Sequence, residues 1–591
     1  MKLQMKNWMK QYKWQIAVIL IAVTVMCVFV SRKEGYHMDE VLSFEFANAE
    51  YTPWIVPWQP EGRFATFVYQ EIETGDFWET TWNWIRYTLD YWINGEDSFA
   101  YNYEGKVYVQ SVWISREEYQ EFVTTGSKDR FNLVSVYYNE IRDSHPPLFY
   151  MCLHLVCSVF QGIMSPWMGA IVNITAMVIC CIFLIKIGML LTGDKKAGTL
   201  AVLLYCLSIG GIETVILIRM YCMLTMFCVI SLYLHLKKWQ NGDYRMGNKL
   251  LILMTALGFW TQYYFVFYAI GIAVVTVFGL MLTKKGKQAL YYIRSMIIAA
   301  AIGIGGFPYA VSDVLEGGVG SAVMENLLGS LQEFAERMQV FGGMVCDSIC
   351  GGRIGMVTFG ALLTAVMLLC LLNKEKRAAL TKERMVQWAM IVVPAAGYFL
   401  ITARISPFYA DRYIMPTYVF VALTFALLLD WCRRYVAELI RKKEGQPDSA
   451  TKAVLADAAA VLLVGCLGIV SILNYGETYL YTGYSDQLEI AEQYADYPCL
   501  CIYDGVTFYE NVPEFTKYRE TLVLTCGELI DRCQFDLLVD CEDVVLLLKR
   551  NVDEAWVHQM MKEKYGYNSY EQIYQDTIYG EKIFFYSMNE E

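Results

Sequence analysis

The chain has 591 residues, a formal net charge of −12, 56% hydrophobic and 15% aromatic residues, and a mean hydropathy of +0.32. This hydrophobic content is well above that of ordinary soluble proteins and indicates a polytopic, α-helical membrane protein. We expect no nucleic-acid partner, because a phosphate backbone requires a basic protein surface.

The first apolar run, residues 14–30, follows Lys2, Lys6, Lys10 and Lys13. Positive charge beside the first membrane helix favours the cytoplasm, so we predict a cytoplasmic N-terminus. The later apolar runs are 169–191, 198–212, 222–236, 250–262, 264–282, 292–311, 354–373, 386–402, 413–431 and 453–475. Together they predict about eleven transmembrane helices, although several runs are shorter than the usual ~20 residues.

The basic gaps between these runs support one alternating topology. Lysine and arginine gather at 195–196, 237–249, 284–287, 374–384 and 433–443, and all of these gaps fall on the cytoplasmic side. The C-terminus is then external. The segment 146–163 is apolar too, but a crossing there would invert every later helix. We therefore interpret it as a re-entrant or juxtamembrane helix.

The pattern divides the chain into four parts. Residues 1–31 form the N-terminal segment and first helix, 32–168 a large first external loop, 169–475 the membrane bundle, and 476–591 an external C-terminal domain. Short β-prone runs such as 499–503 and 543–548 predict a small α/β fold for this last part. The predicted localisation is the cell membrane.

Four polar clusters fall on the external side of this topology. They are His37-Met38-Asp39-Glu40, the segment 142–150 with His145-Pro146-Pro147, Glu213 with Arg219-Met220-Tyr221, and Arg404 with Asp411-Arg412-Tyr413. Ionisable residues at a membrane face are costly, so such clusters indicate function.

These motifs resemble those of the GT-C glycosyltransferases, the superfamily of dolichyl-phosphate mannose-protein mannosyltransferases and aminoarabinose transferases. The features that carry the resemblance are an Asp-Glu pair after the first helix, the HPPLFY segment, an RxY motif and a late RYxxP motif. The resemblance covers roughly residues 14–475 and implies a polyprenyl-phosphate-linked sugar donor. It also implies an acceptor hydroxyl on the outer face and inversion at the anomeric carbon.

By this resemblance Asp39 is the general base. A positioned base accelerates attack by an alcohol by roughly 10²–10⁴-fold. The leaving group is a phosphate anion and needs cations rather than an acid. Arg412 is our first choice to bind that phosphate, because its guanidinium stays charged and matches phosphate oxygens. Arg219 and Arg404 are second choices, and Tyr221 and Tyr413 are candidate hydrogen-bond donors.

Each candidate has a structural alternative. The arginines are also expected as anchors at the membrane interface, His145 as a cap of the Pro-Pro turn, and Asp39 as a helix cap. Glu40 is either a supporting partner of Asp39 or a solvated carboxylate. Glu213 is the acidic residue of the second external loop, in a position that matches the superfamily imperfectly.

We expect no cofactor. A divalent cation between Asp39 and Glu213 would lack further oxygen ligands, which makes a weak site, so no metal ligand is assigned.

Two other functions remain. A transporter or flippase of a lipid-linked intermediate would place charges near helix centres and break paired helices. A membrane assembly subunit for cell-surface polysaccharide would use the tail to bind a partner. The gathering of ionisable residues at one face favours the glycosyltransferase, whose expected partners are the donor, the bilayer and a lipid, glycan or protein acceptor.

Overall fold

The computed structural model describes residues 2–51, 68–94, 111–142, 145–242, 244, 248–310, 325–372, 381–444, 449–475, 479–505, 507–530, 541–576 and 578–588. These residues form two compact units, each assembled from separate stretches of the chain. Unit 1 comprises Met1–Ser31, Ser144–Phe149 and Gly169–Thr478, and unit 2 comprises Arg32–Asp143, Tyr150–Met168 and Tyr479–Glu591.

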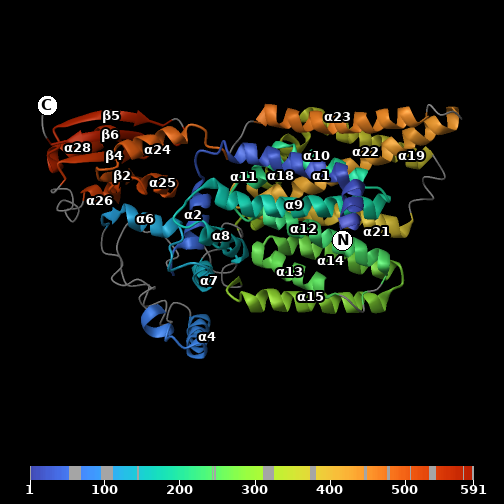
Figure 1. Ribbon diagram of the computed structural model, residues 1–591, viewed down its shortest axis with the longest axis horizontal. Coiled ribbons are helices and arrows are strands. Elements are labelled where there is room, and N and C mark those ends of the chain that lie inside the picture. The colour runs from blue at the N-terminus through green and yellow to red at the C-terminus, as the bar shows by residue number, and fades with distance from the viewer. Residues whose placement is uncertain are drawn as a thin grey trace. The chain divides into compact units, whose positions relative to one another are not determined.

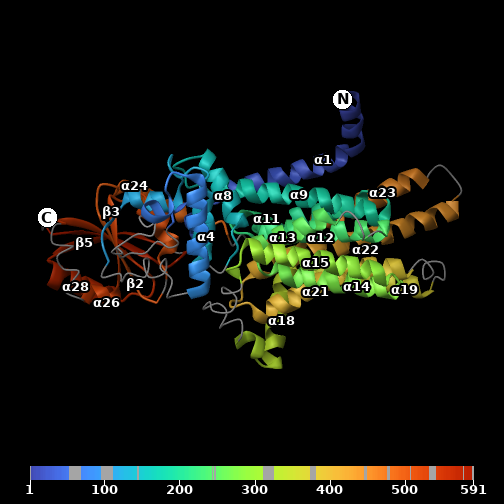
Figure 2. The ribbon, with the colours of Figure 1, turned by 90° about the horizontal axis from the view of Figure 1, so that it is seen from below.

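Unit 1 is a bundle of helices that lie side by side (Figures 1 and 2). Its main elements are α1 (Lys2–Val30), α9 (Pro166–Thr192), α10 (Lys196–Cys206), α11 (Ile209–Ile216), α12 (Tyr221–Asn241), α13 (Lys249–Thr261), α14 (Phe265–Leu282), α15 (Gly286–Gly306), α18 (Leu331–Cys350), α19 (Arg353–Leu372), α21 (Lys382–Ile405), η4 (Asp411–Ile414), α22 (Met415–Glu444) and α23 (Ser449–Tyr475).

Among the described residues, seven helices are long and apolar enough to cross a membrane. The number rises to nine if two bent pairs each count as one span: α10 with α11, bent by 68°, and α18 with α19, bent by 86°. Each predicted apolar run overlaps a helix, and the protein is a multi-pass membrane protein. The predicted runs 222–236 and 250–262 lie on α12 and α13, outside this group, so the expected number of crossings stays a prediction.

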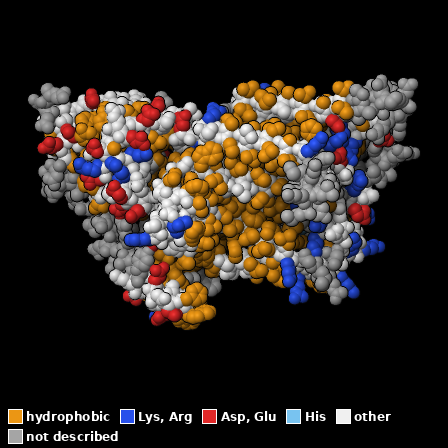
Figure 3. All heavy atoms as spheres, in the orientation of Figure 1, with side chains coloured by type: hydrophobic (Ala, Val, Ile, Leu, Met, Phe, Trp, Pro, Cys, Tyr) orange, Lys and Arg blue, Asp and Glu red, His pale blue; other side chains and the backbone are white. Residues whose placement is uncertain are grey.

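The helix directions in unit 1 give the bundle two distinct ends. α9, α12 and α22 each begin near a candidate site residue and finish beside basic residues, whereas α21 runs the other way and ends next to Arg404. On the face shown in Figure 3, hydrophobic side chains cover the middle of the bundle, and Lys and Arg side chains gather at one end. We call this the basic end.

Unit 2 combines the first loop with the tail. From the loop come α2 (Met38–Asn48), η1 (Val68–Ile72), α4 (Phe77–Asn94), β1 (Ile114–Ser115), α6 (Arg116–Val123), α7 (Leu133–Asn139), η3 (Glu140–Arg142) and α8 (Leu148–Val159). The tail adds α24 (Tyr484–Gln493), β2 (Cys499–Tyr503), η5 (Tyr509–Asn511), α25 (Val512–Phe515), β3 (Glu520–Thr525), α26 (Cys526–Ile530), β4 (Asp543–Leu548), α28 (Glu554–Tyr565), β5 (Ser569–Gln575) and β6 (Lys582–Ser587).

The tail forms the predicted α/β domain around a mixed sheet with the strand order β1-β3-β2-β4-β6-β5. β2 pairs in parallel with β3 and β4, which places its near-continuous run Cys499–Tyr503 at the buried centre. Leu500, Leu522 and Leu546 pack against Val557 and Met561 of α28 on one face.

The first loop contributes a strand to this sheet. Ile114 of β1 pairs with Thr521 of β3 in antiparallel register, and Arg116 donates hydrogen bonds to the carbonyl oxygens of Tyr518 and Ala495. The sequence pattern treated loop 32–168 and tail 476–591 as separate parts, whereas in the structure most of each lies in unit 2.

The segment 146–163 contains a single short helix, α8, of 12 residues. At ~1.5 Å per residue such a helix is too short to cross a hydrocarbon core of ~30 Å. Its length agrees with the interpretation as a re-entrant or juxtamembrane helix.

Candidate functional site

The acid pair lies in the first turn of α2, where local hydrogen bonds fix its backbone. His37 is the N-cap: its Nδ1 accepts a hydrogen bond from the Asp39 N–H at 3.1 Å, and the His37 N–H donates to Glu40 Oε2 at 2.7 Å. This is a reciprocal capping box with histidine in place of serine or threonine. The helix begins at Met38, and His37 rather than Asp39 is its N-cap.

The two carboxylates have different surroundings. Glu40 is fully buried and forms an ion pair with Lys33, with 2.9 Å between Oε2 and Nζ. Burial lowers the pKa of Lys33, and the attraction of Glu40 opposes that shift. The Asp39 side chain keeps 19% of its surface exposed, and its Oδ2 lies 3.6 Å from His37 Nδ1. Burial excludes the solvated alternative for Glu40 and leaves Asp39 as the accessible acid.

The tail holds the segment that precedes the acid pair. Lys33 also donates to the carbonyl oxygen of Tyr479, and the Glu34 N–H donates to the carbonyl oxygen of Leu480 at 2.9 Å. Gly35 lies so close to Tyr484 that an added Cβ would sit 2.8 Å from the Tyr484 ring. Residues 33–35 are therefore positioned by the C-terminal domain, four residues or more before Asp39.

In unit 1 the structure brings together His145 and Arg219, which the sequence placed in separate clusters. His145 Nε2 lies 3.3 Å from Arg219 Nη2. Arg219 is 4% exposed, and His145 is half-buried at the start of the segment that leads into α8. A neutral imidazole nitrogen would accept a hydrogen bond from the guanidinium, which orients both side chains.

Aromatic contacts connect the third and fourth clusters. The rings of Tyr221 and Tyr413 meet edge to face with 6.5 Å between centroids, and Tyr264 lies 6.2 Å from Tyr413. Arg412, half-buried in η4, places its guanidinium carbon 5.3 Å from the Tyr413 ring centroid. The carbonyl oxygen of Tyr413 accepts a hydrogen bond from Tyr398 at 2.9 Å, which fixes this turn.

Glu213 lies near the same turn. It is 4% exposed in the last part of α11. Glu213 and Asp411 both interact electrostatically with the Tyr418 hydroxyl. Glu213, Asp411, Arg412 and Tyr413 thus lie around one end of the bundle, opposite the basic end.

Arg404 has a different position. Its guanidinium donates to the carbonyl oxygens of Ser330 and Leu327 at 3.0 and 2.9 Å, and also to that of Gly329. Arg337 makes the return contact, donating to the carbonyl oxygen of Ser406 at 2.9 Å. These contacts join the start of α18 to the end of α21 and favour a structural role for Arg404.

Among the described residues, no group of three or more His, Cys, Asp or Glu side chains could hold a metal ion. The expectation of a metal-free site stays a prediction.

Sequence reasoning missed Lys33 and Tyr398. Lys33 lies before the start of α2, so no helical periodicity relates it to Glu40, and its position depends on contacts with the tail. Tyr398 lies in the middle of α21 among apolar residues. The local sequence around it therefore does not predict a contact with Tyr413.

Comparison with known proteins gives one matching family. Residues 144–304 match the family described as dolichyl-phosphate-mannose-protein mannosyltransferase, a range that contains His145, Glu213, Arg219 and Tyr221. No curated protein matches the chain.

The fold is similar to that of ArnT from Cupriavidus metallidurans bound to undecaprenyl phosphate, with a TM-score of 0.53, 10% identity, and coverage of 97% of this chain and 98% of that chain. The apo form of that ArnT gives a TM-score of 0.45 at 11% identity, covering 75% of this chain and 87% of that one. The apo oligosaccharyltransferase of Archaeoglobus fulgidus gives 0.40 at 11% identity, covering 99% and 75%.

The family match and the whole-chain similarity to ArnT together support a membrane glycosyltransferase. The chain shares the overall fold of that ArnT structure.

Proposed function

We propose that the protein transfers a sugar from a polyprenyl-phosphate donor to an acceptor hydroxyl on the outer face of the membrane, with inversion and with Asp39 as the general base. The observation that carries the proposal is the contrast within the acid pair: Glu40 is buried against Lys33, while Asp39 stays partly exposed. The ArnT structure with undecaprenyl phosphate supports a lipid-phosphate donor.

The chemistry needs one base and a cationic phosphate site. Asp39 takes the proton of the acceptor hydroxyl as its oxygen bonds to the anomeric carbon, and the bond from that carbon to the phosphate oxygen breaks. The electron pair leaves with the polyprenyl phosphate. A guanidinium stabilises that phosphate charge and needs no proton transfer.

Arg412 remains the first candidate for the phosphate, with Arg219 and His145 as a second group of donors. Arg412 is half-buried and lies beside Tyr413 and Tyr221, whose hydroxyls are additional donors. Arg404 is the weaker candidate, because three backbone carbonyls already accept from its guanidinium.

We assign the candidate site to the outer face because of the lysine- and arginine-rich segments between the apolar runs. The candidate residues of unit 1 lie at the end of the bundle opposite the lysines and arginines, and the positive-inside rule places the basic end in the cytoplasm. A cytoplasmic N-terminus and an external C-terminal domain follow.

The test uses the purified full chain with a panel of radiolabelled polyprenyl-phosphate sugars and candidate acceptors. Consumption of one donor, release of polyprenyl phosphate and an inverted anomeric configuration by NMR are expected. Arg412→Gln should raise the KM for the donor at least tenfold, because one charged phosphate contact contributes roughly 1.5–3 kcal/mol.

The matched control is Arg294→Gln, which removes an exposed arginine of α15. It should leave the donor KM unchanged. Failure to consume any donor, or retention of configuration, would refute the proposed reaction.

A further inference from the structure

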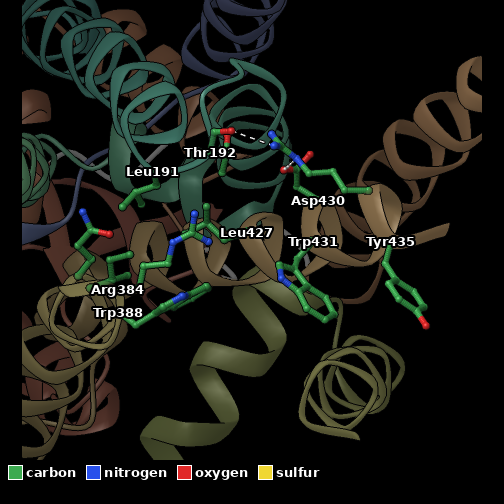
Figure 4. Close-up of a pocket in the computed structure, with 11 residues that line it drawn as sticks. Leu191, Thr192, Arg384, Trp388, Leu427, Asp430, Trp431 and Tyr435 are labelled. Carbon is green, nitrogen blue, oxygen red and sulfur yellow. Dashed lines mark hydrogen bonds and ion pairs between the residues drawn. The ribbon is translucent and has the colours of Figure 1, made fainter. Parts of the chain in front are cut away.

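A pocket opens at the basic end of unit 1, far along the helices from the candidate site. It has a volume of about 240 Å³ and lies between the end of α9, the start of α21 and the last part of α22. Figure 4 shows its lining, in which α22 contributes Leu427, Asp430, Trp431, Arg434 and Tyr435.

The residues that line the pocket form a polar part, an aromatic part and an apolar part. Arg384, Gln387 and Arg434 supply polar groups, Trp388 and Trp431 supply half-buried aromatic rings, and the apolar part is formed by Leu191, Ile391 and Leu427. Figure 4 shows the Arg384 side chain extending toward Leu427. Tryptophan between a polar and an apolar zone is typical of the level of lipid head groups.

The charge of the pocket favours an anion. Two arginines and one aspartate line it, and Asp430 is already neutralised by ion pairs with Arg433 and Arg434, both at 2.7 Å. Arg433 also pairs with Asp457 at 2.6 Å, and Asp457 pairs with Lys196 at 2.7 Å. Asp430 and Asp457 are thus both paired with cations. Neither of them neutralises the positive charge of Arg384.

The hydrogen bonds of Arg434 indicate more specifically where an anion would bind. Its Nε donates to Asp430 Oδ2 and its Nη1 to the carbonyl oxygen of Thr192, at 2.7 and 2.8 Å. Its Nη2 is buried and finds no acceptor in the described part of the chain. A buried cationic N–H without an acceptor is unfavourable, so a small movement of the Arg434 side chain, which is 41% exposed overall, that lets a ligand oxygen reach Nη2 would stabilise the pocket.

The neighbouring surface indicates how such a ligand would enter. Met189 on α9 and Val392 on α21 stand next to lining residues and are each 45% exposed. Exposed apolar side chains on membrane helices contact acyl chains, so the pocket adjoins lipid rather than bulk water.

We propose that this pocket binds the phosphate of a phospholipid head group at the basic end of the bundle. Arg384 and Arg434 would donate to the phosphate oxygens, the tryptophans would flank the glycerol backbone, and an acyl chain would lie along Leu191, Ile391 and Leu427. This site is separate from the donor site, and its ligand belongs to the leaflet that the basic residues face.

Native mass spectrometry of the full chain, titrated with phosphatidylglycerol in neutral detergent, tests the proposal. We expect one lipid to bind wild type about tenfold more tightly than it binds Arg384→Gln, as for loss of one charged hydrogen bond. Gln387→Trp should weaken binding by filling the pocket without a change of charge. Lys287→Gln, which removes an exposed lysine near the basic end, is the control and should bind as wild type does.

Two competitors identify the ligand chemistry. Neither excess diacylglycerol nor excess inorganic phosphate should displace the bound lipid. Displacement by diacylglycerol would show an apolar groove that ignores phosphate, and displacement by inorganic phosphate would show a site for the free anion. Either result overturns the proposal, as would equal affinity of wild type, Arg384→Gln and Gln387→Trp.

Discussion

Two groups of acidic side chains in unit 2 differ in what they leave accessible. At the start of α2, one lysine neutralises one glutamate, and the neighbouring Asp39 keeps part of its carboxylate exposed. In the tail, Lys549 meets Glu510 and Glu581, and Glu514 lies beside them, all buried. The first group leaves one acid partly exposed, whereas the second encloses every carboxylate.

In the tail group, both carboxylate oxygens of Glu514 accept hydrogen bonds. Its oxygens accept from Tyr484 at 2.8 Å and from Asn511 and Gln487 at 2.9 Å each. Burial and the nearby charge of Glu581 raise the pKa of Glu514 to about 8, although the hydrogen bonds oppose that shift. The comparison therefore predicts different responses to substitution and to pH.

The largest stability effect is expected for Glu40→Gln. It leaves Lys33 buried without a countercharge, and removing one partner of a buried ion pair typically costs about 3–5 kcal/mol. Chemical denaturation of the full chain measures this free energy. The double variant Lys33→Met with Glu40→Gln removes both charges and should recover part of the loss. A single variant as stable as wild type would show that the pair contributes little.

A smaller effect is expected for Gly35→Ala, which tests whether the tail positions the acid pair. The added Cβ would lie 2.8 Å from the Tyr484 ring, so the segment before Asp39 must shift. Overpacking of this kind costs about 1–3 kcal/mol. Transfer activity should fall along with stability. Gly126→Ala, in an open part of the first loop where only the Asp129 carboxylate lies near, is the control.

A third expected effect is a pH dependence. Because the folded-state pKa of Glu514 is raised from 4.5 to about 8, its stabilising contribution is complete below pH ~4.5 and is lost as pH rises toward 8. The opening free energy of the β2 and β4 amides, obtained from hydrogen exchange after correction for the intrinsic exchange rate at each pH, should fall over this range. Glu514→Gln should flatten the profile, and an unchanged profile in that variant would assign the dependence to another group.

Much of the helical layout could be predicted because hydrophobic runs in a membrane protein are long and locally encoded. The run 169–191 lies within α9, and 413–431 lies within η4 and α22. The order of the polar clusters also indicated the superfamily. The contact between His145 and Arg219 joins segments 74 residues apart, and only their shared sidedness suggested it.

The remaining features depend on tertiary contacts. The pairing of Ile114 with Thr521 joins a two-residue strand to the tail, and so short a strand has no alternating pattern. Arg404 matched the expectation for a phosphate ligand by residue type and by sidedness. Its contacts with the carbonyl oxygens of Ser330 and Leu327 depend on how α18 packs, which the local sequence does not encode.

The division of roles between Asp39 and Glu40 is tested most directly by single-turnover transfer with Asp39→Asn, measured beside its unfolding free energy. Loss of a general base predicts a rate reduced by roughly 10²–10⁴-fold with near wild-type stability, because the Asp39 backbone cap remains. A variant that transfers sugar at the wild-type rate would contradict the assignment of Asp39 as the base.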